Sequence, residues 1–341
     1  MLEAKLYQKI DNVVKCNLCH HHCVISNYST GICGVRQNID DKLYSLNYGK
    51  LITQAIDPIE KKPIFHYLPG TFTYSIATLG CNLRCQNCQN WEISQYKEKA
   101  NNHIIDFPGN YIEPEEVIKQ ALKYKCLSIS YTYTEPTIFF EYALACMKLA
   151  KENNLKNIWV SNGYMTKECL DLIIPYLDAI NVDLKFFDNK IYLKNCGCQL
   201  KPILDNLKYL VNNKINLEIT TLLIPGLTDL NDQPRQIANF IANELNINIP
   251  WHITKFSPQI SYQLQNFTKT SNQLLNQVYV QGKKEGLNYI YTGNVINDER
   301  ENTYCPKCHN LIITRNGYNI TINNKSDNCL KCGYKLILKY K

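Results

Sequence analysis

Three cysteines lie close together in the motif Cys81-Asn-Leu-Arg-Cys85-Gln-Asn-Cys88, whose spacing is C-x3-C-x2-C. The motif directly follows residues 73–80, an apolar segment that predicts a β-strand. A closed zinc site takes four protein ligands, and an ordinary four-iron cluster takes four thiolates. Three thiolates on a loop at the end of a strand therefore leave one metal position open, which is a property of catalytic metal centres. The alternative is a four-ligand site that a distant Cys or His completes.

Polar side chains stand at the ends of three further predicted strands. Pro136 disfavours the helical region for Glu135, so its carboxylate is held on extended backbone where it can receive an ammonium group. Asn162 lies in a Ser-Asn-Gly turn and suits a ribose or carboxylate contact. Asp183 and Lys185 share one face of their strand because side chains alternate. The alternatives are a surface glutamate, a helix cap and a structural ion pair, respectively.

A second set of four cysteines lies near the end of the chain. Cys305-Pro-Lys-Cys308 and Cys329-Leu-Lys-Cys332 are separated by twenty residues, which is a zinc-ribbon spacing. A ribbon this small needs metal to fold, so the sequence predicts a structural Zn²⁺ site. An iron centre is the alternative, and docking of a partner or of RNA is a further role for the module.

A third set lies near the start of the chain. Cys16, Cys19, Cys23 and Cys33 follow the spacing C-x2-C-x3-C-x9-C, with three histidines at positions 20–22. Four such ligands suit either zinc or a second iron–sulfur cluster, and the sequence does not decide between the two metals. We prefer a metal-binding loop to disulfides because the compartment is expected to be reducing.

The cysteine content itself points to metal or redox chemistry. The chain has 16 cysteines among 341 residues, and its first residues are mixed and charged rather than a secretory signal. No apolar run approaches the roughly 18 residues of a membrane span. We therefore expect a cytoplasmic, non-membrane protein. Cys196 and Cys198, after the fourth predicted strand, are interpreted either as plain buried thiols or as a redox pair near the site.

Charge is spread unevenly along the chain. Residues 73–299 carry 21 basic and 22 acidic groups, whereas residues 300–341 carry 8 basic and 2 acidic groups. The neutral middle argues against a nucleic-acid groove. The basic tail is interpreted first as a solvated surface.

The elements that must position these residues alternate along the middle of the chain. Six segments rich in β-branched or aromatic residues predict strands at 73–80, 127–133, 157–163, 179–185, 216–224 and 250–256. Helical patterns begin between them near residues 114, 166, 203, 234 and 271. Strands that alternate with helices predict an α/β fold with a parallel sheet. About 250 residues are typical of an eight-fold barrel, so this shorter stretch favours a partial (β/α)6 barrel.

This organisation predicts three parts. Residues 1–72 form a cysteine-rich N-terminal segment with small strands, residues 73–299 the partial barrel, and residues 300–341 the zinc ribbon. His252, in the sixth predicted strand, is kept as a substrate-side candidate, although a lone strand histidine is more often a core residue.

The C-x3-C-x2-C motif resembles the signature of radical S-adenosylmethionine (SAM) enzymes. The resemblance implies that Cys81, Cys85 and Cys88 hold a [4Fe–4S] cluster whose open iron chelates the amino and carboxylate groups of SAM. In that superfamily one electron from the cluster splits SAM into methionine and a 5′-deoxyadenosyl radical, which abstracts hydrogen. The usual fold there is a partial (β/α)6 barrel. The reaction implies anaerobic conditions and a low-potential electron donor of the ferredoxin or flavodoxin type.

The resemblance extends to the expected SAM contacts. Glu135 is similar in position to the acidic residue of the Gly-Gly-Glu element of activating enzymes, although Tyr133 and Thr134 replace the glycines. Asp183-Leu-Lys185 resembles a string in the SAM site of the pyruvate formate-lyase activating enzyme group. Together with Asn162, these residues are expected to help hold SAM.

One position departs from the pattern. Asn87 precedes the third cysteine, where the superfamily often has an aromatic residue near the adenine, and Trp91 is a candidate to supply a ring instead.

Longer strings resemble one group within the superfamily, the AmmeMemoRadiSam system radical SAM enzymes, which are often labelled pyruvate formate-lyase activating enzyme-like. These strings are residues 55–63, 65–70, 80–94, 131–136, 181–185 and 250–252. The resemblance implies an association with Memo-class and AMME-class proteins and a protein substrate.

Two other functions are alternatives to this activating-enzyme-like reaction. A radical SAM RNA-modifying enzyme has the basic tail as its support. A non-catalytic iron–sulfur electron-transfer protein would need neither an open iron nor polar strand ends.

Overall fold

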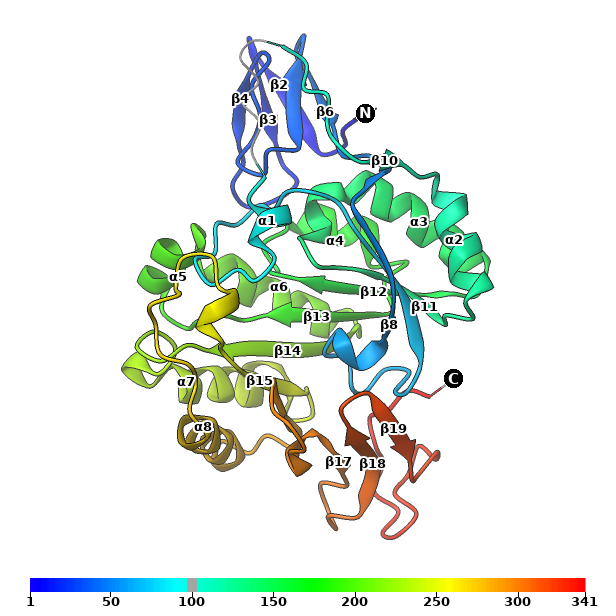
Figure 1. Cartoon of the computed structure of the whole chain (residues 1–341), viewed down its shortest axis with the longest axis vertical. Helices are drawn as coiled ribbons and strands as arrows, with labels where there is room; N and C mark the ends of the chain where they lie inside the picture. Colours follow the sequence, from blue (N-terminus) through cyan, green and yellow to red (C-terminus); the bar gives the residue numbers. More distant parts are fainter. Residues whose placement is uncertain (97–102, 341) are drawn as a thin grey trace.

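A single large sheet organises the chain (Figure 1). The computed structural model describes residues 1–96 and 103–340. In spatial order the sheet runs β16-β15-β14-β13-β12-β11-β9-β8. Its strands are β8 (Thr53–Pro58), β9 (Phe72–Ala77), β11 (Ser128–Tyr131), β12 (Lys156–Ser161), β13 (Ala179–Asp183), β14 (Asn216–Leu223), β15 (Trp251–Lys255) and β16 (Ile290–Gly293).

The predicted α/β architecture is confirmed. All six predicted strands form, and they pair in parallel in chain order from β9 to β15. The observed strands stop two residues earlier than predicted at β11, β12 and β13. Glu135, Asn162 and Lys185 therefore lie on loops beyond the carboxyl end of the sheet, where α/β enzymes bind ligands.

The strand count of the predicted (β/α)6 barrel was too low. β16 adds a seventh parallel strand beside β15, and β8 adds an antiparallel strand at the opposite edge. β16 has four residues, three of them buried. β8 ends at Pro58, and proline is tolerated on an edge strand because it needs no donor there. β8 lies within residues 1–72, so that segment contributes a strand to the barrel sheet.

Helices connect the parallel strands. They are α1 (Trp91–Ser94), α2 (Pro114–Lys123), α3 (Phe140–Glu152), α4 (Lys167–Ile173), α5 (Asn189–Cys196), α6 (Lys201–Asn212), α7 (Gln233–Phe240), which continues as a π-turn (Ile241–Asn246), and α8 (Asn272–Lys284). Short 3-10 turns cover Ile59–Lys61, Pro136–Phe139, Leu230–Asp232, Pro258–Ile260 and Glu299–Glu301. The predicted cap is confirmed at Thr166, whose side chain accepts a hydrogen bond from the Cys169 amide at 3.3 Å. The core fills the space between sheet and helices, with Trp159, Ile180 and Leu207 fully buried.

Small antiparallel sheets precede the barrel and lie at one end of the molecule (Figure 1). They comprise β1 (Leu2–Glu3), β2 (Tyr7–Ile10), β3 (Val13–Cys16), β4 (Val24–Ser26), β5 (Arg36–Ile39) and β6 (Lys42–Ser45), with β7 (Lys50–Leu51) paired to β10 (Asn110–Tyr111). A buried ion pair joins them to the barrel, because the Arg36 guanidinium lies 2.6 Å from the Glu141 carboxylate of α3.

The C-terminal strands β17 (Thr303–Tyr304), β18 (Leu311–Asn316) and β19 (Asn319–Ile322) form a small sheet at the other end (Figure 1). Arg315 is buried and donates to the Phe65 carbonyl at 2.9 Å. The Lys339 amide donates to the His66 carbonyl at 2.8 Å. The tail is therefore docked on the loop between β8 and β9. Among the described residues, no helix is long and apolar enough to cross a membrane.

Candidate functional site

The loop that carries the three central cysteines begins directly after β9 and is held in place by backbone hydrogen bonds. The Gly80 amide donates to the Ile93 carbonyl at 2.8 Å. The Arg84 and Gln86 amides donate to the carbonyls of Cys196 and Asn195, each at 2.9 Å. The loop is thus clamped between α1 and the carboxyl end of α5.

The three thiols have different surroundings. Burial raises the pKa of Cys81 and of Cys88, whereas a hydrogen bond from Cys196 lowers the pKa of Cys85. Cys88 also has the Ser94 hydroxyl 3.1 Å from its sulfur. Among the described residues, these sulfurs do not form a group within 4.8 Å of one another.

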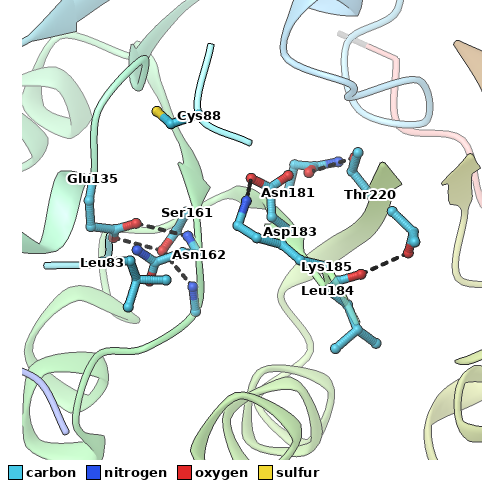
Figure 2. Close-up of polar contacts among 12 residues, drawn as sticks. Leu83, Cys88, Glu135, Ser161, Asn162, Asn181, Asp183, Leu184, Lys185 and Thr220 are labelled. Carbon is cyan, nitrogen blue, oxygen red and sulfur yellow. Dashed lines mark hydrogen bonds and ion pairs between the residues drawn. The ribbon is translucent and has the colours of Figure 1, made fainter. Parts of the chain in front are cut away.

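Glu135 lies at the centre of a buried hydrogen-bond network (Figure 2). Its Oε1 accepts from the Thr137 amide at 3.1 Å, the Thr137 hydroxyl at 2.6 Å and the Ser161 hydroxyl at 2.8 Å. Its Oε2 accepts from the Asn162 amide at 2.8 Å. Burial raises the pKa of Glu135, and these four donors oppose that shift.

Asn162 links this network to the cysteine loop. Its Nδ2 donates to Asn82 Oδ1 at 2.7 Å and lies 3.9 Å from the sulfur of Cys81. The Glu135 carboxylate is also close enough to raise the pKa of Cys81, after the larger effect of burial. The structure therefore brings the polar ends of β11 and β12 beside the first of the three thiols.

Asp183 and Lys185 form an ion pair, with Lys185 Nζ 2.7 Å from Asp183 Oδ2 (Figure 2). Burial alone lowers the pKa of Lys185, but Asp183, Cys85 and Cys196 outweigh burial and raise it. Lys185 is thus within electrostatic reach of the second central thiol. The three cysteines and the four predicted SAM residues gather at the carboxyl end of the parallel strands.

Comparisons with known proteins agree with this geometry. The family described as Radical SAM superfamily matches residues 75–241. The chain is also 40% identical over 340 residues to the uncharacterized protein MJ0808 of Methanocaldococcus jannaschii, with 98% of this chain and 99% of that protein covered. The chain belongs to the radical SAM superfamily. The matched region begins in β9 and includes all seven residues gathered at the carboxyl end of the parallel strands.

Other relatives carry the names of activating enzymes. A putative glycyl-radical enzyme activating enzyme of M. jannaschii is 28% identical over 189 residues, covering 53% of this chain and 66% of that protein. The pyruvate formate-lyase-activating enzyme of Clostridium pasteurianum is 25% identical over 204 residues, covering 55% and 80%. The fold is similar to that of SuiB from Streptococcus suis bound to its precursor peptide, with a TM-score of 0.50, 15% identity, and 70% and 52% of the two chains covered.

Membership of the radical SAM superfamily implies a [4Fe–4S] cluster and SAM, and the residues present fit both groups. Three thiols stand on one loop with a polar network on either side. Asn87 is buried, and its Oδ1 makes no hydrogen bond within the described part of the chain. An unpaired buried acceptor beside Cys88 is suited to a ligand that donates a hydrogen bond. Trp91 is 39% exposed and stacks on Tyr262 at 5.3 Å, so its ring already has an aromatic partner.

The backbone before Glu135 explains one departure from the radical SAM pattern. Tyr133 stands where activating enzymes have a glycine, and its φ of 62° is in the left-handed region that favours glycine. Tyr133 compensates through its ring, because its hydroxyl donates to Asp57 and Lys62 Nζ lies 4.1 Å from the ring centroid. The loop therefore keeps a glycine-like conformation without the glycine.

His252 does not join the radical SAM site. Its Nε2 lies 2.6 Å from Glu218 Oε2, and both side chains are buried. Glu218 also accepts hydrogen bonds from the Phe65 and His66 amides, each at 2.8 Å. His252 is the second residue of β15, whereas the site residues follow the strand ends. We therefore assign His252 to a structural network, not to the substrate side.

Asn82 is a contributor to the candidate site that the sequence does not indicate, and Cys196 is one for which the sequence left two interpretations open. Asn82 lies inside the cysteine motif and accepts from Asn162, but nothing in the motif indicates that role. Cys196 ends α5 and hydrogen-bonds with Cys85, and burial raises the pKa of the nearby Cys198 thiol. This position favours the interpretation of Cys196 as a thiol of the site.

The four tail cysteines form a compact group. Their sulfurs all lie within 4.8 Å of one another, as a metal site requires. The Cys305–Cys332 and Cys308–Cys329 sulfur pairs are each 3.7 Å apart.

Proposed function

We propose that this radical SAM enzyme uses a [4Fe–4S] cluster on Cys81, Cys85 and Cys88 to cleave SAM reductively and generate a 5′-deoxyadenosyl radical that acts on a partner protein. One observation carries the proposal. Three thiols, the Glu135–Asn162 network and the Asp183–Lys185 pair lie together at the carboxyl end of the parallel strands. When bound, the cluster supplies one electron to SAM.

The surrounding residues are suited to hold the two charged ends of SAM. Glu135 Oε2 accepts one recorded hydrogen bond and has a remaining lone pair for an ammonium group. The Asn162 side chain lies against the Cys81 sulfur. On the other side, Asp183 holds Lys185 charged, and this cation suits a carboxylate.

A protein substrate is supported by the relatives rather than by a docking surface. Two of the relatives are named as activating enzymes, one for glycyl-radical enzymes and one for pyruvate formate-lyase. We propose Memo-class and AMME-class proteins as the first candidates for the partner, on the resemblance of the longer sequence strings. A ferredoxin- or flavodoxin-type protein is the proposed electron donor.

One experiment tests this function directly. The reconstituted enzyme is incubated anaerobically with SAM, a reductant and each candidate partner, and both proteins are then analysed by mass spectrometry. We expect 5′-deoxyadenosine together with a changed or cleaved partner. SAM cleavage without any change in the partners tried would reject those partners but keep the reaction. No cleavage with an intact cluster would reject the reaction.

We also propose that the four tail cysteines bind one Zn²⁺ ion; they are Cys305, Cys308, Cys329 and Cys332. A tetrahedral site with Zn–S bonds of about 2.3 Å has sulfurs about 3.8 Å apart, close to the observed 3.7 Å pairs. Four thiolates close such a site, so the role is structural. Arg315 joins the tail to Phe65, which means that truncating the tail would also damage the barrel.

A point variant is therefore the better test of the tail. We expect Cys329→Ser to lose one zinc per chain and to lower the unfolding temperature, while SAM cleavage at low temperature is retained. Metal binding supplies folding free energy to such modules, which explains the expected instability. Zinc is measured by elemental analysis, with Cys169→Ser, a buried thiol of α4, as the matched control. An unchanged zinc content in Cys329→Ser would contradict the assignment.

The Lys185 cation gives a second prediction. We expect Lys185→Met to weaken SAM binding by at least about tenfold, because one charge-assisted hydrogen bond is lost. Asp183 is partly exposed and can be solvated after the change, so the cluster should remain. Binding is measured by anaerobic calorimetry, with iron content as the control. Wild-type affinity in this variant would return Asp183 and Lys185 to a structural ion pair.

A further inference from the structure

The four N-terminal cysteines line a single pocket. Cys16, Cys19, Cys23 and Cys33 all border one small pocket, although they are spread over eighteen residues of sequence. Cys16 and Cys33 are buried, and Cys19 and Cys23 are partly exposed. Their convergence is therefore a product of folding, not of local spacing alone.

The fold holds these cysteines firmly. The Cys16 amide donates to the Cys23 carbonyl at 2.9 Å, which closes the hairpin between β3 and β4. Cys19 pairs as an isolated bridge with Met165, just after β12, and the Thr166 amide donates to the Leu18 carbonyl at 3.1 Å. The barrel itself thus shapes the loop that presents the thiols.

The four tail cysteines can be compared with the four N-terminal cysteines of the same chain. The tail sulfurs lie within 4.8 Å of one another, as a single ion requires. Among the described residues, the N-terminal sulfurs form no such group, even though all four border one pocket. The four N-terminal cysteines thus share one pocket without the tight sulfur grouping of the tail, and four thiolates around one pocket can hold a four-iron cluster.

Charge around the pocket supports the same conclusion. Arg36 borders the pocket and is 1% exposed, and its Nε makes no hydrogen bond in the described part of the chain. Its other end pairs with Glu141 at 2.6 Å. A buried guanidinium with an unused donor is costly unless an acceptor faces it. Metal-bound thiolates and cluster sulfides are acceptors of the required charge, so Arg36 supports a metal centre in this pocket.

We propose that Cys16, Cys19, Cys23 and Cys33 hold a second iron–sulfur cluster, beside the three-cysteine site rather than remote from it. Asn82, within the central motif, also borders the N-terminal pocket. His21 Nε2 lies 2.7 Å from the Asn82 carbonyl oxygen.

Gly80 also lies against the N-terminal loop. A Cβ at Gly80 would lie 2.8 Å from the Cys33 carbonyl oxygen and 2.6 Å from a methyl group of Val35. Real Cβ atoms do not approach backbone so closely, so only glycine lets the N-terminal loop reach the residue before Cys81. The contact at Gly80 therefore also joins the two cysteine-bearing loops.

This placement gives the second cluster a role that rests on the proposed SAM chemistry. A ferredoxin- or flavodoxin-type donor is oxidised by one electron and reduces the second cluster. The second cluster then passes that electron to the central cluster and returns to its oxidised state. Ile32 borders the pocket and is 42% exposed, so an incoming donor can approach the site from solvent.

Metal content tests the site without using activity. Three anaerobically reconstituted proteins are compared: wild type, the triple variant Cys81→Ala/Cys85→Ala/Cys88→Ala, and the double variant Cys16→Ser/Cys33→Ser. Iron, sulfide and zinc are measured per chain. We expect about eight irons in the wild type and about four in each variant, since each cluster holds four.

The triple variant decides the outcome even if the double variant does not fold. About four irons in the triple variant, with an electron paramagnetic resonance signal on reduction, would establish the second cluster. A triple variant with no iron and one zinc beyond that of the tail would overturn the proposal. This result is independent of SAM cleavage, so failure of the proposed function would not be mistaken for failure of the cluster.

The relay is tested separately on the folded double variant. Reduction of the central cluster is followed by its loss of visible absorbance after mixing with reduced flavodoxin or with dithionite. We expect the double variant to be reduced at least about tenfold more slowly than wild type by flavodoxin but at a similar rate by dithionite. Equal rates with flavodoxin would overturn the relay.

Discussion

Replacing Cys85 with alanine should abolish the release of 5′-deoxyadenosine from SAM. Cys85 is the most buried of the three central thiols and the middle ligand of the motif. A hydrogen bond from Cys196 lowers its pKa, which favours the thiolate that iron requires. The two remaining thiolates are too few to hold a four-iron cluster. We therefore expect loss of the central iron together with loss of the product, measured by chromatography of the anaerobic reaction.

The control for this experiment is a thiol outside the site. Cys126 is buried just after the end of α2, so Cys126→Ala removes a thiol of similar burial without touching the cysteine loop. This variant should keep both the central iron and the product. Because the second cluster is expected to remain in Cys85→Ala, iron is compared with the triple variant rather than with zero. Product formation by Cys85→Ala would contradict the three-thiolate site.

The strands around the site were predictable because each is a short apolar run with a polar end. β9 and β11 to β15 are buried along most of their length, which is typical of parallel strands covered on both faces. β16 was missed although it matches β11 in length and is mostly buried. β8 was missed because it alternates between exposed and half-buried residues along most of its length. Edge strands carry weaker sequence signals because only part of their surface is buried.

The sequence indicated which residues belong to the candidate site, but not which residues they contact. A carboxylate before a proline indicated Glu135, yet its four hydrogen bonds come in part from Ser161 and Asn162 at the end of another strand. The proximity of Cys196 to Cys85 likewise depends on α5, a helix that no sequence pattern indicated. Such contacts join residues that are distant in sequence, so no local sequence pattern can indicate them.

The buried hydrogen-bond network around His252 and Glu218 shows why residue type alone is a weak guide to catalysis. His252 and Asp183 are both polar residues on central strands, but His252 lies near the start of its strand and Asp183 ends its own. The carboxyl end of a parallel sheet faces the ligand, whereas the amino end faces supporting structure. Here that support is the segment Phe65–His66, which Glu218 and Arg315 bind from either side.

Substitution of Glu135 should weaken SAM binding by about ten- to a hundredfold while the cluster remains. One charged hydrogen bond contributes roughly 1.5–3 kcal/mol, which corresponds to that range. Glu135→Ala would also leave the Thr137, Ser161 and Asn162 donors unpaired, so it is expected to lower stability. Glu135→Gln is the sharper variant, because it keeps the shape of the side chain but not its charge.

The surroundings of Glu135 separate a binding role from a structural role. All four recorded partners of its carboxylate are donors, so a glutamine must turn its NH2 group towards at least one of them. Ser161→Ala disturbs the same network but leaves the carboxylate in place, and it is the matched control. We expect SAM affinity, measured anaerobically on protein of equal iron content, to fall in Glu135→Gln and to change by less than about threefold in Ser161→Ala. Equal losses in both variants would mean that Glu135 only shapes the loop, because the charge would then make no separate contribution to SAM binding.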